Sequence, residues 1–261
     1  MVLVNFKLVY SKVKAYPRLS KFFKMLEADS EVQTLLKMAN VMAVTRLFYN
    51  DHGVVHSRTV AGSALEIMDI LERKGVQPSI VRDGEGDYED SRIVVLGGSY
   101  LHDIGNSLHR DMHHVYGTYL ADRILRRMLL KLYGGDKHKA TVLKQEILHA
   151  ILSHEDALTP LTVEAGVVKV ADGTDMAEGR ARIPYKLGKS DIHSFSALAI
   201  KRVEVEEGES RPVKILVDME NEAGVFQVEQ VLGVKIKGSG IADMIEVEVL
   251  RRGELLKVWR P

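Results

Sequence analysis

Hydrophobic residues between positions 17 and 177 recur at the spacing of amphipathic helices. The stretch 54–74 shows this pattern clearly, and Gly75 follows it as a stop signal. Its apolar residues would share one helix face: Val60, Ala64, Ile67, Met68 and Leu71. The same spacing predicts further helices over 17–49 and at about 91–103, 111–133, 137–153 and 160–177. Several helices with short links predict an all-α domain.

The pattern changes after about residue 190, where apolar and polar residues begin to alternate. Strands are predicted over 201–206 and 213–219, followed by a short helix over 222–232 and strands over 245–249 and 255–259. The order β-β-α-β-β describes a small α+β domain. We therefore expect a mainly α chain with two domains, a helical one over residues 1–188 and the α+β one over residues 189–261.

Composition excludes several classes of protein. Lys and Arg together equal Asp and Glu at 36 each, so no net charge favours nucleic acid or a membrane surface. Cysteine is absent, which excludes a disulfide framework and cysteine–zinc sites. No apolar run reaches the ~20 residues that span a bilayer, and the first residues lack the features of a secretory signal. These observations predict a cytoplasmic protein with neither a membrane nor a nucleic acid as partner.

Several histidines and aspartates stand out because they lie in similar sequence surroundings. Nine of the ten histidines lie between residues 52 and 154. Several of these side chains adjoin strongly apolar helical stretches: His56, His102, Asp103, His113, His154 and Asp172. Neutral imidazole and carboxylate are good ligands for divalent cations. A single histidine on a helix is more often a solvated or hydrogen-bonded side chain, so the order of the set carries the argument.

That order, His…His-Asp…His…His…Asp, resembles the HD-domain superfamily of metal-dependent phosphohydrolases. The resemblance covers roughly residues 45–185 and includes three local strings: Leu101-His102-Asp103-Ile104-Gly105, His113-x-x-x-Gly117, and Val168-Lys169-Val170-Ala171-Asp172. It implies that His56, His102, Asp103 and Asp172 bind a metal. His113 and His154 match positions that hold a second metal in the extended members, although Ser153 stands where some relatives have another histidine. His52, four residues before His56, would share its helix face and be a further candidate ligand if the helix begins before Gly53.

The resemblance also implies a mechanism. One or two divalent ions (Mn, Fe, Ni, Co or Mg) would be bound, and two ions could share Asp103 and a bridging hydroxide that attacks phosphorus. Asp103 or Glu155 would help to move protons. The expected substrate is a phosphoester or phosphoanhydride of a nucleotide or similar small metabolite. Asn106 replaces the lysine of cyclic-dinucleotide phosphodiesterases, and their Gly-Tyr-Pro signature is missing after His154, which counts against that substrate.

A phosphorylated substrate needs positive partners. Arg180 and Arg182 follow soon after Asp172, and the guanidinium group suits phosphate oxygens. We therefore take them as candidate substrate-binding residues, although basic residues at a helix end can simply complement its dipole. The acidic, glycine-rich stretch 82–90 lacks the spacing of a calcium loop and is expected to form a loop beside the site.

A second hypothesis is a metal- or nucleotide-binding regulatory module without turnover. In that case the α+β domain would pass a bound-state signal to a partner. The alternating strands of this domain could also form a homo-oligomer interface, a lid or an effector site. The sequence does not choose among these roles.

Overall fold

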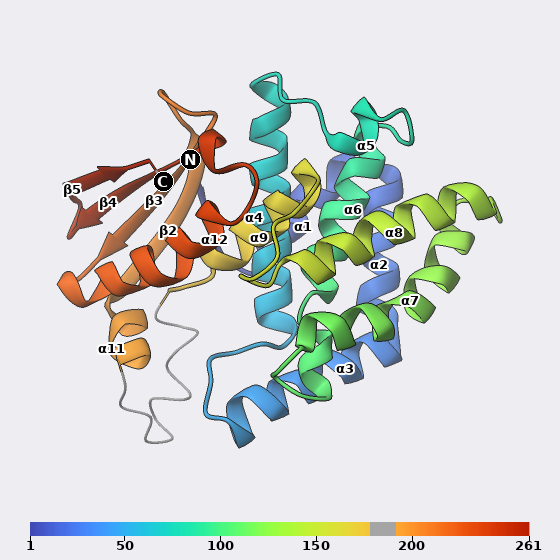
Figure 1. The fold of residues 1–261 in the computed structure, drawn as a ribbon, viewed down its shortest axis with the longest axis horizontal. Coiled ribbons are helices and arrows are strands. Elements are labelled where there is room, and N and C mark those ends of the chain that lie inside the picture. Colours follow the sequence, from blue (N-terminus) through green and yellow to red (C-terminus); the bar gives the residue numbers. More distant parts are fainter. Residues whose placement is uncertain (178–191, 261) are drawn as a thin grey trace.

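The computed structural model describes residues 1–177 and 192–260, and the part before residue 178 is built almost entirely of helices (Figure 1). In chain order these are α1 (Leu8–Lys12), α2 (Pro17–Ala28), α3 (Ser30–Asn40), α4 (Val54–Arg73), α5 (Ser79–Arg82), α6 (Tyr88–Leu101), α7 (His113–Leu132), α8 (Lys137–Ser153) and α9 (Val163–Thr174). Short turns accompany them: the 3-10 helices η1 (Val13–Ala15) and η3 (Ile104–Ser107), and the π-helix η2 (Val41–Arg46). No helix of the described residues is long and apolar enough to cross a membrane.

Helix α6 lies at the centre of the helical part. Every residue from Asp90 to Leu101 is buried, because α2, α4, α8 and α9 pack around it. A helix that is apolar on all sides, as the run Ile93-Val94-Val95-Leu96 makes this one, is stable only when it is surrounded. Gly97 and Gly98 let α8 approach closely, since a Cβ at either position would lie 2.8 Å from a side chain of that helix. The central helix therefore delivers its last residues to the interior of the protein.

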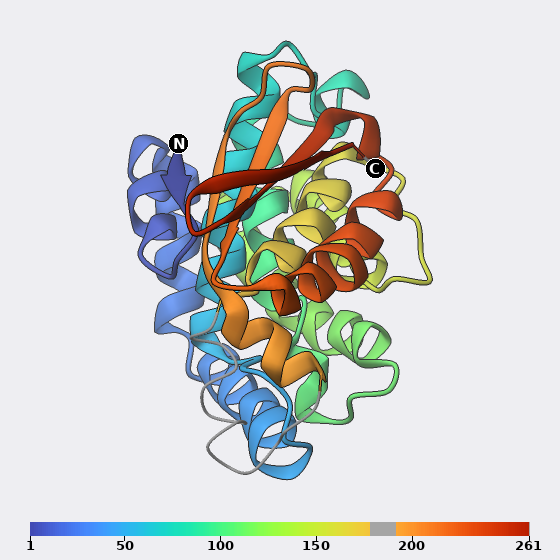
Figure 2. The same ribbon diagram turned by 90° about the vertical axis from the view of Figure 1, so that its left-hand side faces the viewer.

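The C-terminal part contributes β2 to β5 to a five-stranded sheet with the order β1-β2-β3-β4-β5, which lies toward the viewer in Figure 2. Its elements are α11 (Ile192–Ala199), β2 (Ile200–Glu207), β3 (Val213–Met219), η4 (Glu222–Gly224), η5 (Gln227–Leu232), α12 (Gly233–Lys237), η6 (Ala242–Met244), β4 (Ile245–Arg251) and β5 (Glu254–Trp259). The predicted fold class, helical domain then β-β-α-β-β, is confirmed. The predicted helix does not end at 232, because the π-helix η5 continues directly into α12. These helices belong to the crossover connection between β3 and β4, which pair in parallel.

The first strand of the sheet was not predicted. β1 (Val2–Leu3) pairs antiparallel with β2, with Val2 opposite Val205. A strand of two residues has too few positions to show alternation, so its existence depends on the partner. One hydrophobic cluster runs through the helices and the sheet and includes Val9, Ile67 and Val217. The predicted domain boundary at 188/189 lies outside the described residues.

The acidic stretch 82–90 does not border the metal-ligand candidates, so that expectation was wrong. It lies at the N-terminal end of α6, where Asp87 caps the helix by accepting hydrogen bonds from the backbone amides of Glu89 and Asp90. Arg18 pairs with Asp87 at 2.6 Å. The 14 residues of α6 separate this loop from His102 by about 21 Å. Its carboxylates stabilise a helix start and a salt-bridge network.

Candidate metal centre

Within the described part of the chain, the ends of five helices meet at one point. They carry the six side chains expected to bind metal: His56 in the first turn of α4, His102 at the C-terminal cap of α6 with Asp103 just beyond, His113 as the first residue of α7, His154 at the C-terminal cap of α8, and Asp172 in the last turn of α9. All six are less than one-tenth exposed. Three of the ends are helix C-termini, whose partial negative charge favours a cation.

Two pairs of imidazoles face each other across this point. His56 and His102 approach with their Nε2 atoms 3.1 Å apart, and His113 and His154 with theirs 3.0 Å apart. The carboxylate of Asp103 lies between the pairs. Its Oδ2 is 3.4 Å from His56 Nε2 and 3.3 Å from His102 Nε2, whereas its Oδ1 is 3.5 Å from His113 Nε2. One carboxylate can thus serve two adjacent cation positions.

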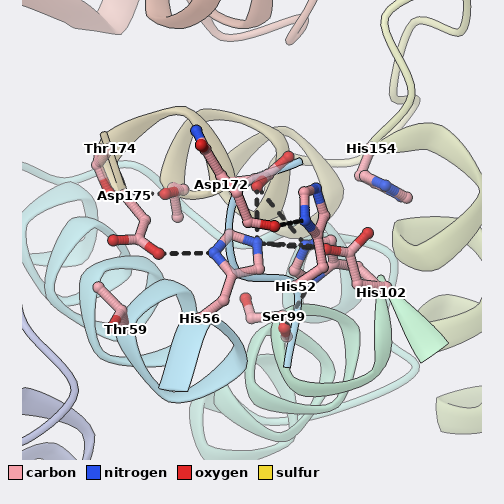
Figure 3. Close-up of polar contacts among 12 residues, drawn as sticks. His52, His56, Thr59, Ser99, His102, His154, Asp172, Thr174 and Asp175 are labelled. Atoms are coloured by element: carbon pink, nitrogen blue, oxygen red, sulfur yellow. Dashed lines mark hydrogen bonds and ion pairs between the residues drawn. The ribbon is translucent and has the colours of Figure 1, made fainter. Parts of the chain in front are cut away.

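Asp172 joins the first pair. Its Oδ1 lies 3.2 Å from His56 Nε2 and 3.6 Å from His102 Nε2. Figure 3 shows these three side chains turned toward one another, with His154 beside them. Among the described residues, ligand atoms within 4.8 Å of one another form four groups: His56, His102 and Asp103; His102, His154 and Asp172; Asp103, His113 and His154; and His113, His114 and Glu155. Because Asp172 contacts the first pair of imidazoles, we assign His56, His102, Asp103 and Asp172 to a first position, and Asp103, His113 and His154 to a second. The structure brings together the whole predicted set, and the role of each residue as a ligand stays a prediction.

Backbone carbonyls fix the orientation of three of the imidazoles. Each ring donates its Nδ1–H to a carbonyl three residues earlier: His102 to Ser99 (2.8 Å), His113 to Arg110 (3.0 Å) and His154 to Ile151 (2.6 Å). A carbonyl oxygen only accepts, so these Nδ1 atoms carry hydrogen and the Nε2 atoms are left to point at the cluster. This is the tautomer that metal-binding histidines adopt.

His113 and His154 form the pair whose geometry most directly favours a bound cation. Burial lowers the pKa of His113 to about 4 and holds the pKa of His154 well below its usual value. Both rings are therefore neutral at pH 7, and their Nε2 lone pairs face each other at 3.0 Å. Two lone pairs at this distance repel, and a cation between them turns the repulsion into two bonds. The donor set thus fits a divalent metal.

The other half of the cluster attracts positive charge. Although burial opposes it, the neighbouring His102 lowers the pKa of Asp103 well below the usual range, so this carboxylate is ionised. Burial by itself would lower the pKa of His102, but the negative charge of Asp103 outweighs it and raises this pKa to about 9. Without a metal the site therefore holds a proton at His102, and a divalent ion would replace that proton.

Asp175 is a part of the site that the sequence did not indicate. It follows α9, and its Oδ2 accepts the Nδ1–H of His56 at 2.6 Å, drawn as a dashed line in Figure 3. A carboxylate behind a histidine fixes the ring and makes its other nitrogen a better ligand. Its position three residues after Asp172 was the available signal, since both lie at the end of the same helix.

An Asp175→Ala variant is expected to weaken the binding of Mn²⁺ by about 10- to 100-fold, because His56 loses the group that orients it. Isothermal titration calorimetry would measure the change. Asp111→Ala is the matched control, since Asp111 lines the same cavity but its side chain is 88% exposed. Equal losses in the two variants would show that only the charge of the cavity matters.

Two glycines bring the two halves of the site together. Gly105 in η3 lies so close to the start of α7 that a Cβ there would be 1.9 Å from the carbonyl oxygen of His113 and 2.5 Å from the amide of Gly117. Gly117 in turn lies under the carbonyl of His102, which a Cβ would approach to 3.3 Å. The motif glycines are therefore needed for backbone contact, which sets His113 beside Asp103.

Asn106 holds the bridging carboxylate. Its Nδ2 donates to Asp103 Oδ1 at 2.7 Å and to the Asp103 carbonyl at 3.1 Å. In the sequence, Asn106 was notable only because it replaces the lysine of cyclic-dinucleotide phosphodiesterases. In the structure it orients the one residue that both cation positions share.

His52 lies outside the ligand groups. It precedes α4, which begins at Val54, and its ring centroid is 5.7 Å from that of His56. Its Nδ1 lies 2.6 Å from the carbonyl oxygen of Asn50. His52 does not share a helix face with His56, because Gly53 caps α4 after His52.

A cavity of about 720 Å³ opens onto the cluster. Among the described residues that line it, six carboxylates (Asp103, Asp111, Glu155, Asp156, Asp172 and Asp175) face two cations (Arg110 and Lys235), which leaves a formal charge of −4 with neutral histidines. Glu155 is one-third exposed, and its Oε2 is 3.8 Å from His113 Nδ1. Arg180 and Arg182 lie outside the described residues. The negative charge of this lining favours cations over anions.

Comparison with known proteins agrees with this geometry. Residues 53–177 match the model of the HD-domain family, and the match ends just after the last ligand candidate. The chain belongs to the HD-domain superfamily. It is 51% identical over 219 residues to an uncharacterized protein of Methanocaldococcus jannaschii, with 84% of each chain covered. No solved structure matches the chain.

Proposed function

We propose that this protein is a metal-dependent phosphohydrolase that cleaves a phosphoester or phosphoanhydride of a nucleotide or similar small metabolite. The observation that supports it is the carboxylate of Asp103, set between two pairs of imidazoles whose Nε2 atoms face each other. A site that only bound one ion would need half of these groups. Two adjacent cation positions that share a carboxylate suit in-line displacement at phosphorus.

Divalent cations held here would supply a nucleophile from water at neutral pH and offset the negative charge of the phosphoryl oxygens. The protein residues supply the rest. Arg110 and Lys235 place positive charge on the cavity wall, where phosphoryl oxygens would lie. Glu155, at the cavity and partly exposed, would hold or deliver the proton of the leaving group. Asn106 and Asp175 keep Asp103 and His56 in place.

The cavity favours a small, polar substrate. Its volume of about 720 Å³ lies in the range of sites for small molecules. Polar side chains line much of it, among them Tyr49, Asn50 and Gln230. These groups suit hydrogen-bonding ligands such as a sugar or a base.

The test is phosphate release from a panel of nucleotides, other phosphomonoesters and phosphodiesters, with Mn²⁺, for the wild type and for Asp103→Ala. Turnover on one class that disappears in the variant would support the proposal and name the substrate class. Turnover that survives in the variant would place the activity elsewhere. If the folded, metal-loaded wild type turns over nothing, the proposal fails and a regulatory module that binds metal or nucleotide becomes the better account.

A further inference from the structure

The C-terminal part of the chain reaches into the candidate metal centre through one side chain. Lys235, on α12, places its Nζ 2.8 Å from Asp172 Oδ2, 3.2 Å from the carbonyl oxygen of His154 and 3.5 Å from Asp156 Oδ1. The two carboxylate oxygens of Asp172 therefore have different partners. Oδ2 faces Lys235, and Oδ1 faces His56 and His102.

The placement of Lys235 follows from close packing between α12 and the helix that carries Asp172. A Cβ at Gly173 of α9 would lie 3.1 Å from the side chain of Leu232, and one at Gly166 would lie 2.6 Å from the carbonyl oxygen of Ser239. The two glycines are about two turns apart on α9, so the residues that flank α12, Leu232 before it and Ser239 after it, lie directly against this helix. Figure 1 shows α12 and α9 side by side. Lys235 is therefore held in place and does not simply reach in from the surface.

We propose that the C-terminal part forms the substrate-recognising wall of the cavity and that Lys235 binds the phosphoryl group. This inference rests on the proposed function and adds to it the residue and the domain that recognise the substrate. The substrate would carry a terminal phosphoryl group, whose negative charge Lys235 and Arg110 would offset, and a polar organic part.

The contacts of the ammonium group leave room for this role. Two of its three N–H bonds are directed to Asp172 and to the His154 carbonyl. The third faces Asp156, whose side chain is half exposed and 3.5 Å away, so a phosphoryl oxygen could replace it. Lys235 lines the cavity with only 15% of its side chain exposed, and a charge so placed is screened little by solvent. Arg110 provides the second positive charge from the segment before α7.

The segment before α12 supplies the rest of the wall. Gln227, Gln230 and Val231 of the π-helix η5 line the same cavity. A π-helix turns its side chains out of the α-helical register, and such turns are frequent at functional sites. The amide of Gln230, which is exposed, is suited to hydrogen-bond the organic part of a substrate. The helical part of the chain thus holds the metal candidates, and the C-terminal part faces what they would act on.

The test compares Lys235→Gln with Lys237→Gln. The second variant removes the same charge from the same helix, but Lys237 is exposed and lies over the ring of Trp259, 5.5 Å from its centroid. Glutamine at 235 removes the charge but keeps an N–H donor on the side of Asp172, on a side chain one bond shorter than lysine. The probes are Mn²⁺ alone and then inorganic phosphate at saturating Mn²⁺, each followed by calorimetry. Thermal unfolding by circular dichroism checks the fold of each variant.

We expect Lys235→Gln to bind Mn²⁺ within about threefold of the wild type but inorganic phosphate at least about tenfold more weakly, since a charge-assisted hydrogen bond is lost. Lys237→Gln should match the wild type in both titrations, and Lys235→Arg should keep phosphate binding. Equal phosphate affinity in Lys235→Gln and the wild type would overturn the inference. So would a loss of phosphate binding that follows entirely from lost Mn²⁺. If the phosphate difference is found but no substrate is turned over, the proposed function fails while the phosphoryl site stands.

Discussion

Replacing Asp103 with alanine is expected to abolish metal binding at both positions and to lower kcat/KM by on the order of 10³-fold or more, because several kcal/mol of transition-state stabilisation depend on the metals. The reason is that its two oxygens face different imidazole pairs, Oδ2 toward His56 and His102 and Oδ1 toward His113. Removal of one carboxylate therefore deprives both positions of a ligand. Equilibrium dialysis with Mn²⁺, followed by elemental analysis, measures the number of ions retained.

His113→Ala gives the comparison that makes this result specific. We assign His113 to the second position, where it lies beside Asp103 and His154, so this variant should retain one ion at the position assigned to His56, His102, Asp103 and Asp172. His138→Ala is the control, since its side chain is 82% exposed and remote from the cluster. If Asp103→Ala and His113→Ala each lost one ion, Asp103 would not be shared between two positions.

A second large effect is expected from Gly105→Ala. The new Cβ would lie 1.9 Å from the backbone oxygen of His113, and neither backbone segment can yield without moving α7 away from η3. The free energy of unfolding should fall by at least about 3 kcal/mol, which corresponds to a decrease in Tm of roughly 6–12 °C for a chain of this size. Thermal and urea unfolding of the two proteins measure it.

Gly75→Ala separates steric from conformational cost. Gly75 ends α4 with φ of +85° and has nothing within 4 Å of its Cβ position, so alanine there should cost only about 1 kcal/mol. Gly105→Ala should in addition weaken Mn²⁺ binding, since the contact it breaks sets His113 beside Asp103. Equal destabilisation by the two substitutions, with metal binding intact in both, would show that the Gly105 contact is soft.

The metal-ligand candidates could be predicted because the fold delivers them from separate helix ends in a recognisable order. His102 and Asp103 follow an apolar run, and that run is buried on all sides as α6. The predicted position of the acidic stretch 82–90 was wrong for a different reason. Nearness in sequence to the His-Asp pair suggested nearness in space, whereas a straight helix carries the two ends to opposite sides of the core.

Lys235 could not be predicted. Lys235 and Lys237 are two similar lysines of one short helix, and only the packing of α12 on Gly173 decides which of them reaches Asp172. Asp175 was closer to being predictable, because it shares a helix end with Asp172. Residues that touch a ligand from a distant segment leave no local pattern, since their spacing is set by tertiary packing.

The pairing of β1 with β2 has a consequence for the order in which the molecule assembles. Residues 2 and 205 are adjacent in the sheet although most of the chain separates them. Contacts between such distant segments form late, because closing a long loop costs entropy before any contact compensates it. The helical part can collapse around α6 during synthesis, while the sheet must wait for the segments beyond residue 200. Lys235 would then reach Asp172 near the end of folding, after the helix ends that carry the metal-ligand candidates have come together.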